Sequence, residues 1–538
     1  MPGVIADLIR VHADHAPEEI IAPGVLAAGA RRYPDKPLLL QGNDLITYGE
    51  AARGVNRIAT GLAARHVGPG TQVAIMGHNS FAWFMTWIAV LKVGAVAVPV
   101  NTGLKGVDLT YILTNSQAAL IVCDPEFEAA VSRALADGGL SAEVVPDMNT
   151  LLDPGAAALE APSAPTLGHD EPGQIMYTSG TTGPPKGVVI RRSQIGPAAG
   201  LLVGSMIGVD ASDVLYTCFP LFHASGQASC LAAMWNGATV ALARRFSASR
   251  FWEELVHYGA TRFNYLGGIP RILMKTAPTP AESEHRVEFC FGAAMPSDLW
   301  LDFEKRFGVR ALELYSQTEG GFLYNGPDGK VGSIGTPIPG FGEVAILDAS
   351  GAQCGPDTVG ELCFRPPDPA MLPRFWNSPE EQERRTDGGW LHTGDLARFD
   401  HDGFYYFEDR QKDGLRRRGE NISSWSIETA ISAHPSVLEC AAYGVPSELG
   451  EDDVKVDVVL RPGAALDEPE LVLWCGERLA SFMVPRYVQF RDSLPKTETL
   501  RVQKHLLKRE GVADAWDRDK HTYLTSLPMG HRPLFAGD

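Results

Sequence analysis

The chain has no paired cysteines and few basic residues. Its eight cysteines are scattered, and no two stand at the Cys-x-x-Cys spacing typical of zinc sites and redox pairs. Neither a zinc site nor a disulfide framework is therefore predicted. The 47 Lys and Arg residues are outnumbered by 65 Asp and Glu residues, which gives a net charge of −18. Such an acidic chain is a poor match for nucleic acid or an anionic membrane, so neither is expected as a partner.

Long apolar runs are also missing. The nearest approach is residues 81–100, which Lys92, Gly94 and Pro99 interrupt. A buried helix over 80–92 and a buried strand over 95–98 explain this run better than a membrane span does. Residues 1–19 lack a basic segment followed by an apolar one, so we expect a cytoplasmic protein.

What is present predicts a large protein of the α/β class. The 538 residues are 45% hydrophobic and 21% charged, which suits two or more globular domains. Strands and helices alternate in the first part of the chain, and this predicts parallel α/β layers. The expected elements are a hairpin over 37–48, a helix over 51–62, a strand over 72–76, a helix over 107–115 and a strand over 119–122.

Residues 177–189 carry the strongest chemical signal. Glycines and hydroxyl residues precede a single lysine, Lys186, between two apolar runs. Small residues let backbone N–H groups approach an anion, and the hydroxyls and the lysine can bind phosphate oxygens. We predict that this loop binds the outer phosphates of a nucleotide. It is not the common P-loop, because Gly187 stands where a magnesium-binding hydroxyl would follow the lysine. A flexible linker is the alternative interpretation.

Three further segments have the residue types of a nucleotide site. Residues 289–296 run from an apolar strand into small residues, against which an adenine ring can lie. In residues 315–320, an aromatic ring can stack on adenine and Glu319 can bind Mg²⁺. Asp395, before a hairpin with an Asp-Gly turn, can accept both ribose hydroxyls. The alternative for these polar segments is that they only form turns.

Together, these segments resemble the adenylate-forming (ANL) superfamily, which includes acyl-CoA synthetases, amino-acid adenylation domains and luciferases. The similar strings are TSGTTGPPKG, PLFHASG, YSQTEG, VGELCF and TGD, in the family's order, and the likeness extends over roughly residues 20–510. The segment GFYYFEDRQKDGLRRRGENIS is most similar to carnitine/crotonobetaine-type acyl-CoA ligases. The resemblance implies a large N-terminal domain of layered α/β sheets over 1–410 and a small, mobile α+β domain over 411–538.

The resemblance also implies roles for individual residues. The catalytic residues would be Lys186, Glu319, Arg501 and His223, which would lie beside the acyl pocket at the end of a strand predicted over 214–223. The nucleotide would be bound by Thr178, Ser179, Gly180, Thr181, Thr182, Gly183, Gly292, Ala293, Ala294, Tyr315, Ser316, Gln317, Thr318, Asp395, Phe407 and Arg410. Thr178 and Glu319 would hold Mg²⁺, and Lys412 would be the hinge. CoA would be bound by Arg417, Arg418, Gly419, Glu420 and Asn421, although adjacent arginines also fit a solvated charge run.

The C-terminal loop departs from the family pattern. Leu500 replaces a glycine, and Arg501 stands where the family has a lysine that bridges the substrate carboxylate and the α-phosphate during adenylation. A planar guanidinium on a longer stem cannot place its charge where an ammonium sat. Losing one well-aimed donor to a developing oxyanion costs about 3 kcal/mol, or ~100- to 1,000-fold in rate. The alternatives are that Arg501 does the lysine's work, or that Lys496 or Lys504 replaces it.

The resulting expectation is an acyl-CoA ligase that transfers an acyl group from acyl-AMP to CoA and is weak in, or lacks, ATP-dependent adenylation. Its cofactors would be ATP or AMP, CoA and Mg²⁺, and a companion adenylating enzyme of secondary metabolism would supply acyl-AMP. A competent two-step synthetase and a non-catalytic acyl-adenylate-binding protein are the alternatives. The acid is expected to lie among residues 223–235, 265–270 and 316–322, with room for a bulky apolar group. The oligomeric state stays open, with a homodimer as one option.

Overall fold

The computed structural model describes residues 20–152, 165–168, 170–178, 184–266, 268–297, 299–410, 415–417, 420–422, 424–447, 450–495, 502 and 504–521. The expected site residues at 179–183, Lys412, Arg418, Gly419 and Arg501 lie outside these ranges. For Arg410, Glu420 and Asn421 only the backbone is described.

The strands of the described residues form five sheets. The nine-stranded sheet has the order β15 (Thr336–Pro337), β14 (Gly320–Asn325), β13 (Arg310–Gln317), β12 (Phe289–Ala293), β11 (Arg262–Leu266), β9 (Val214–Thr217), β10 (Thr239–Leu242), β1 (Pro37–Gln41) and β2 (Asp44–Thr47). The seven-stranded sheet has the order β18 (Arg374–Trp376), β8 (Lys186–Arg191), β7 (Pro172–Thr178), β4 (Val96–Pro99), β3 (Gln72–Met76), β5 (Leu120–Cys123) and β6 (Glu143–Val145). A four-stranded sheet contains β16 (Glu343–Leu347), β17 (Gly360–Arg365), β19 (Leu391–Phe399) and β20 (Tyr405–Arg410).

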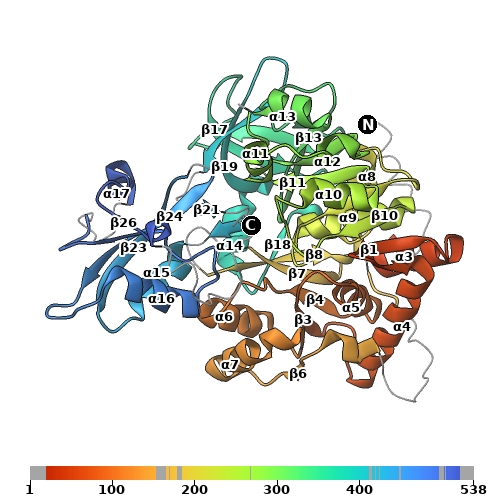
Figure 1. Cartoon of the computed structure of the whole chain (residues 1–538), viewed down its shortest axis with the longest axis horizontal. Coiled ribbons are helices and arrows are strands. Elements are labelled where there is room, and N and C mark those ends of the chain that lie inside the picture. The colour runs from red at the N-terminus through yellow and green to blue at the C-terminus, as the bar shows by residue number, and fades with distance from the viewer. Residues whose placement is uncertain are drawn as a thin grey trace.

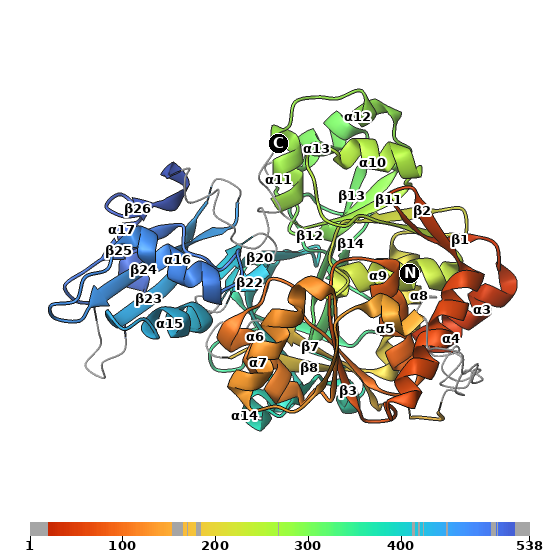
Figure 2. The same cartoon turned by 60° about the horizontal axis from the view of Figure 1, so that its bottom comes forward.

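Helices separate and cover the two large sheets (Figures 1 and 2). Between the sheets lie α3 (Ala22–Arg32), α4 (Tyr48–Ala64), α5 (Phe81–Lys92), α8 (Pro197–Met206) and α9 (Ala224–Asn236). The outer face of the seven-stranded sheet carries α6 (Gly106–Ser116) and α7 (Glu128–Gly138). The nine-stranded sheet is covered by α10 (Phe251–Tyr258), α11 (Gly268–Lys275), α12 (Ala281–Glu284) and α13 (Trp300–Phe307), and the short helix α14 (Pro379–Arg385) follows β18.

The period of two along each strand produces these layers. In β9, Leu215 belongs to the central core, whereas its neighbour Tyr216 faces the outer helices. In β3, Val73 faces the central core and Ala74 faces α6 and α7. Since helices cover both faces of each of the two large sheets, the sequences of their strands are nearly continuous runs of apolar residues.

Local signals explain where helices begin. Ser80 Oγ accepts a hydrogen bond from Trp83 N at 3.1 Å and caps α5. Ten of the twelve residues of α5 are buried, which confirms that the apolar run is a core helix. Among the described residues, no helix is long and apolar enough to cross a membrane.

The strand expected over 214–223 is wrong beyond Thr217. β9 ends there, and His223 is the N-cap of α9, with His223 N donating to Pro220 O at 3.0 Å. Proline lacks the N–H that a strand ladder needs, so the apolar residues 218–222 turn instead of extending the sheet.

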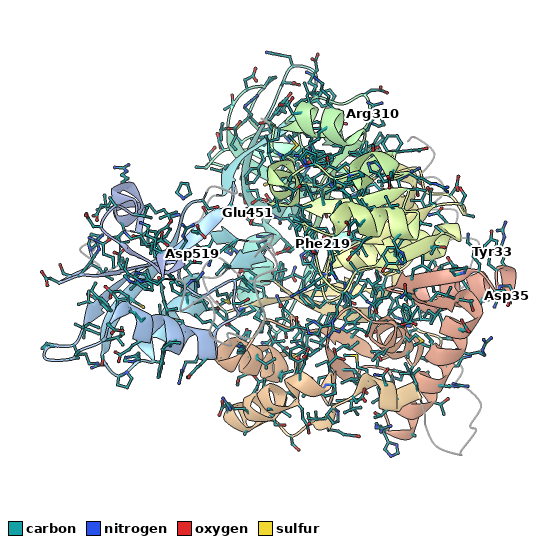
Figure 3. All side chains as sticks on the ribbon, in the orientation of Figure 1. Tyr33, Asp35, Phe219, Arg310, Glu451 and Asp519 are labelled. Atoms are coloured by element: carbon teal, nitrogen blue, oxygen red, sulfur yellow. The ribbon has the colours of Figure 1, made fainter. Side chains whose placement is uncertain are left out.

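The small domain has its own core. It contains the hairpin of β21 (Leu415–Arg417) and β22 (Glu420–Ile422) and the sheet of β23 (Val437–Pro446), β24 (Asp452–Leu460), β25 (Tyr487–Phe490) and β26 (Trp516–Asp517). Its helices are α15 (Ser424–Ser432), α16 (Glu468–Arg478) and α17 (Lys504–Glu510). In Figures 1 and 2, α15 and α16 lie beside α6 of the large domain, and Ser426 Oγ donates to Asp108 Oδ1 at 2.8 Å across this contact. Figure 3 places Asp519 in the small domain, at the other end of the long axis from Tyr33 and Asp35.

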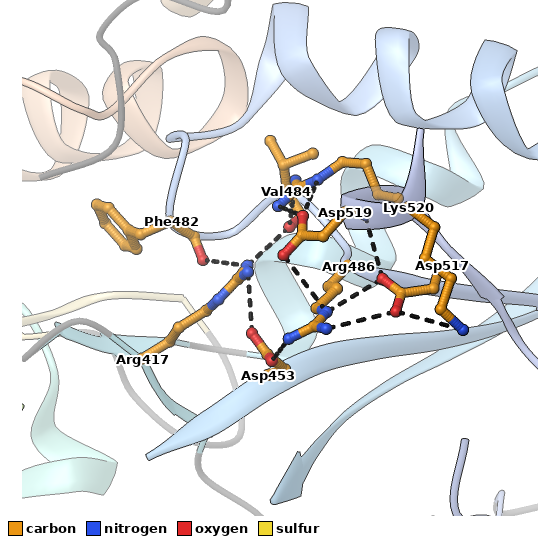
Figure 4. Close-up of polar contacts among 9 residues, drawn as sticks. Arg417, Asp453, Phe482, Val484, Arg486, Asp517, Asp519 and Lys520 are labelled. Carbon is orange, nitrogen blue, oxygen red and sulfur yellow. Dashed lines mark hydrogen bonds and ion pairs between the residues drawn. The ribbon is translucent and has the colours of Figure 1, made fainter. Parts of the chain in front are cut away.

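A chain of ion pairs links β21 to the C-terminal strand (Figure 4). Arg417 Nη2 lies 3.0 Å from Asp453 Oδ1, and Asp453 Oδ2 lies 2.7 Å from Arg486 Nη1. Arg486 Nε then lies 3.1 Å from Asp517 Oδ1 and 3.4 Å from Asp519 Oδ2. Burial raises the pKa of Asp517, but the hydrogen bonds from Arg486 and from the backbone N–H of Asp519, together with the charges of Arg486 and Lys520, lower it by more, so the net shift is downward. The network ties Asp517 and Asp519, which lie in the part of the chain after Val512 for which the sequence offered no interpretation, into the domain.

We predict that Asp517→Asn lowers the free energy of unfolding by about 1–3 kcal/mol at neutral pH, because a charged partner of Arg486 is lost. The folded-state pKa of Asp517 is below its unfolded value, so its stabilisation is present above about pH 3.9 and disappears as the pH falls through the folded pKa. Urea denaturation at neutral and acidic pH measures both effects. The exposed residue Asp514 supplies the control, Asp514→Asn; equal losses in the two variants at neutral pH would contradict the prediction.

Candidate active site

A cavity of about 790 Å³ lies beside the carboxyl ends of strands in the nine-stranded sheet. It brings together most of the described residues that the sequence predicted. The expected residues that line it are Thr178, Lys186, His223, Gly292, Ala293, Ala294, Tyr315, Ser316, Gln317, Thr318, Glu319, Asp395 and Phe407. Ligand sites in α/β proteins are commonly found at this edge of a sheet.

Asp395 is held by two side chains from β13. Tyr315 Oη donates to Asp395 Oδ2 at 2.7 Å, and Gln317 Nε2 donates to the same oxygen at 2.8 Å. Tyr315 and Gln317 lie at the end of β13 and point to the same side, toward Asp395. The ring of Tyr315 stacks on Phe364 of β17, with centroids 6.0 Å apart. An aromatic ring and a fixed carboxylate therefore lie side by side at the cavity, where the sequence predicted contacts with adenine and ribose.

A second hydrogen-bonded layer supports the turn that carries Asp395. Glu361 Oε1 accepts from Gly394 N at 2.8 Å, and Glu361 Oε2 lies 2.9 Å from His392 Nδ1. Asp395 is also opposite Arg410 in the register of β19 and β20, so the backbone places both predicted ribose contacts on neighbouring strands. The role of Arg410 stays a prediction.

The wall predicted for adenine depends on a buried glutamate that the sequence interpretation missed. Glu313, 2% exposed, accepts hydrogen bonds from Ala294 N and from Met295 N, the latter at 3.1 Å, and Tyr265 Oη donates to it at 2.7 Å. These bonds hold Ala294 at a φ of 62°. A Cβ on Gly292 would lie 2.0 Å from Tyr265 O, so strands β11 and β12 meet there only because position 292 is glycine. A charged residue inside the apolar run of β13 was the available signal.

Charged residues of α14 line the cavity beside Lys186, at the end where the sequence predicts phosphate binding. Lys186 Nζ lies 3.5 Å from Glu381 Oε2, and Arg384 Nη2 lies 2.6 Å from Glu381 Oε1. Burial raises the pKa of Glu381, whereas the hydrogen bond and charge of Arg384 and the charges of Lys186 and Arg385 lower it. The lowering is larger in sum, so the net shift is downward and this carboxyl stays ionised at neutral pH. The sequence interpretation missed α14, because a short helix of acidic residues followed by basic ones looks like a solvent-exposed surface.

Arg385 joins the two ends of the site. Its Nη2 donates to Gln317 Oε1 at 2.9 Å and lies 3.3 Å from Glu319 Oε1, while its Nη1 donates to Thr393 O at 3.2 Å. Glu319 is thus held at the cavity wall. Its oxygens and the hydroxyl of Thr178 are the type of ligand that Mg²⁺ prefers.

His223 lies at the wall where α9 begins. Its Nδ1 accepts from Ser225 N at 3.2 Å and lies 3.0 Å from Ser225 Oγ. The accepting Nδ1 requires the Nε2–H tautomer in the neutral ring. His223 therefore has a capping role in addition to its place in the cavity.

Arg417 does not line the cavity. Its guanidinium, 4% exposed, is paired with Asp453 and donates to Phe482 O at 3.3 Å and Val484 O at 3.0 Å. The structure thus places Arg417 inside the small domain, while its role toward CoA stays an untested prediction.

Comparison with known proteins now decides the family. Residues 26–376 match the family described as AMP-binding enzyme, and residues 426–500 match the AMP-binding enzyme C-terminal domain. The chain belongs to the AMP-binding enzyme family. A probable CoA ligase of Humulus lupulus is 30% identical and covers 92% of this chain and 97% of its own length. The crotonobetaine/carnitine–CoA ligase of Proteus mirabilis is 31% identical, with coverages of 86% and 92%.

Solved structures confirm the expected ANL fold class. A double mutant of the o-succinylbenzoate CoA synthetase of Bacillus subtilis, bound with its product analogue OSB-NCoA, has a TM-score of 0.79 at 25% identity and covers 90% of this chain and 98% of that chain. The same synthetase in complex with AMP has a TM-score of 0.64 at 25% identity, with the same coverages. Sequence and fold together identify this chain as an acyl-CoA ligase of the AMP-forming class.

We predict that Tyr315→Phe weakens AMP binding about 10-fold, because Asp395 loses a donor that fixes it, worth about 1.4 kcal/mol. Isothermal titration calorimetry with AMP measures the effect. Tyr258→Phe is the matched control, since the hydroxyl of Tyr258 accepts from Gly42 N on the surface, away from the cavity. Unchanged affinity in Tyr315→Phe would refute the assigned role.

Proposed function

We propose that this ligase transfers an acyl group from acyl-AMP to CoA and is weak in, or lacks, ATP-dependent adenylation. The observation that carries the proposal is Arg501 in the position of the family's adenylating lysine, preceded by Leu500. The guanidinium has a different shape and reach from an ammonium, and leucine removes the backbone freedom of glycine.

The position of another lysine supports this interpretation. Lys504 Nζ lies 2.7 Å from Glu428 Oε1 and donates to Ser424 Oγ at 2.8 Å. Both partners are on α15 of the same domain, so moving Lys504 into the cavity would break an ion pair and a hydrogen bond. This arrangement argues against Lys504 as a substitute for the missing lysine.

The arrangement of the two domains also favours the CoA step. The TM-score is 0.79 to the synthetase bound with a CoA product analogue and 0.64 to the same synthetase with AMP. The first chain is a double mutant of the synthetase seen in the second, and the difference in TM-score supports a domain arrangement of this chain that is nearer to the CoA-product complex than to the AMP complex. In this arrangement the β21–β22 hairpin, predicted to bind CoA, would serve thioester formation.

The proposed reaction requires positioning more than acid–base chemistry. The CoA sulfur attacks the carbonyl carbon of acyl-AMP, a C–S bond forms, the C–O bond to the phosphate breaks, AMP leaves and the thiol proton passes to solvent. Tyr315, Gln317 and Asp395 would hold the adenosine, and Lys186 would stabilise the phosphate of the leaving AMP. Thr178 and Glu319 would hold Mg²⁺, which would offset phosphate charge when ATP is bound. A companion adenylating enzyme would supply the acyl-AMP.

The competent two-step synthetase is the second candidate. It is favoured by the nucleotide end of the cavity, where Lys186, Glu319 and Asp395 are all in place. The non-catalytic alternative is separated from both by turnover, since a binding protein would not convert acyl-AMP and CoA into acyl-CoA.

We predict little acid-dependent exchange of pyrophosphate into ATP, together with ready formation of acyl-CoA from synthetic acyl-AMP and CoA. Arg501→Lys combined with Leu500→Gly should raise the exchange rate by roughly 100- to 1,000-fold, because it restores the ammonium and the loop's freedom. Labelled-pyrophosphate exchange measures the first reaction and mass spectrometry the second.

Arg509→Lys makes the same chemical change at an exposed residue of α17 and should leave exchange unchanged. Robust exchange by the natural protein would sink the split-reaction proposal and favour the two-step synthetase. Absence of acyl-CoA from acyl-AMP would favour the binding protein.

A further inference from the structure

The cavity has an apolar end that is distinct from its nucleotide end. The side chains Leu202, Met206, Leu231 and Ile338 line it and are all buried in the central hydrophobic core. They come from α8, α9 and the loop after β15. The nucleotide residue Tyr315 and its stacking partner Phe364 belong instead to a separate core around the four-stranded sheet.

Among the described residues that line the cavity, the Lys, Arg, Asp and Glu side chains lie toward the nucleotide end. Among the described side chains that line the cavity, those from α8, α9 and residues 322–341 include no Lys, Arg, Asp or Glu. The lining cations Lys186, Arg384 and Arg385 each lie within an ion pair with Glu381 or Glu319. A second charged group on the acid would therefore enter the apolar end with no Lys, Arg, Asp or Glu partner among the described residues.

Polar side chains near the apolar end are engaged with the protein. Gln174 Oε1 accepts from Trp87 Nε1 at 2.7 Å, and Gln174 Nε2 donates to Gln227 Oε1 at 2.9 Å. Gln227 Nε2 donates in turn to Leu221 O at 2.9 Å. These hydrogen bonds engage the two side-chain amides within the protein. The surface that a ligand would meet at this end is therefore formed mainly by apolar side chains.

Asn264 differs from the two glutamines. Its Nδ2 donates to Ser225 O and Ser229 Oγ, both at 3.1 Å, while its Oδ1 has no hydrogen-bond partner. The solvent-accessible area of that oxygen is less than 1 Å², so it cannot act as a hydrogen-bond partner for a bulky charged group in the cavity.

We infer that the acyl group is uncharged and mainly apolar: the acid carries no second carboxylate, no sulfonate and no quaternary ammonium. This inference rests on the proposed function, because it assigns the apolar end of the cavity to the acyl part of acyl-AMP. Burying an unpaired charge against this wall would cost far more than the contacts return.

The test uses N-acylsulfamoyl adenosines, which mimic acyl-AMP but do not transfer their acyl group. One pair compares a straight-chain acyl group ending in methyl with the same chain ending in carboxylate. The other pair compares a tert-butyl end with a trimethylammonium end of the same shape. In each pair the neutral ligand should bind on the order of 100-fold tighter by calorimetry, because only the charged one is desolvated without a partner.

The outcomes separate this inference from the proposed function. The inference is overturned if the charged ligands bind as tightly as, or more tightly than, their neutral counterparts. It is also overturned if the neutral ligands bind no more tightly than AMP alone. Absence of AMP binding would remove the nucleotide site itself, and the inference with it. Since none of these ligands reacts, the order of affinities does not depend on which half-reaction the enzyme performs.

A charge placed on the wall provides the complementary test. Val203 of α8 is half-buried and lines the cavity, so Val203→Lys should reduce the preference for the methyl-ended over the carboxylate-ended ligand by at least about 10-fold. Ser205 on the same helix is exposed and does not line the cavity. Ser205→Lys is the matched control and should leave the preference unchanged. If Val203→Lys does not fold, the ligand pairs with the natural protein decide the question.

Discussion

One carboxylate oxygen, Asp395 Oδ2, receives hydrogen bonds from both Tyr315 and Gln317 and thereby joins the four-stranded sheet to the nine-stranded sheet. The remaining features of the nucleotide end depend on this junction. Arg385 reaches Gln317 and Glu319 because the same strand and turn present both. The turn before Asp395 is held in place by Glu361. A cavity formed by two sheets thus gains one rigid corner, and a small polar ligand can be oriented against it.

Charge is distributed unevenly along the cavity. At the end predicted to bind phosphate, Lys186 and Arg384 each form an ion pair with Glu381. A bound anion could take the place of Glu381 as the partner of one of these cations. At the other end, α8 and α9 present an apolar wall whose nearby amides are bonded within the core. An acyl-adenylate has the same polarity along its length, with a phosphate in the middle and an acyl group at one end. This distribution of charge is the one expected of a cavity that binds the proposed acyl-adenylate.

The small domain adds a separate constraint. Arg417 of the β21–β22 hairpin is fixed through Asp453 and Arg486 to the strand β26 near residue 517. The hairpin predicted to meet CoA is therefore part of one rigid unit with the sheet and the C-terminal strand. A contact such as Ser426 to Asp108 then sets how this unit lies against the large domain. If the hairpin binds CoA as predicted, its positioning would depend on these two sets of contacts.

Sequence alone determined much of this protein. The strand Gln72–Met76, the buried helix Phe81–Lys92 and the two strands that flank the phosphate loop all follow from apolar periodicity, capping residues and glycine content, which act over a few residues. Motif order identified the family, and most of the expected site residues that the structure describes line one cavity. The roles of these residues and of Arg501 stay predictions.

Only the tertiary structure decided the rest. Glu313 and the charged helix α14 join the site because strands and loops far apart in the sequence converge on it, and no local pattern distinguishes such residues from ordinary buried or surface charges. The strand expected through His223 failed for a different, local reason: apolar residues continue to Phe222, but Pro220 has no N–H to donate to a strand ladder, and the chain turns into α9. Local chemistry specifies the elements, whereas the polarity of the cavity arises from long-range packing that brings them together.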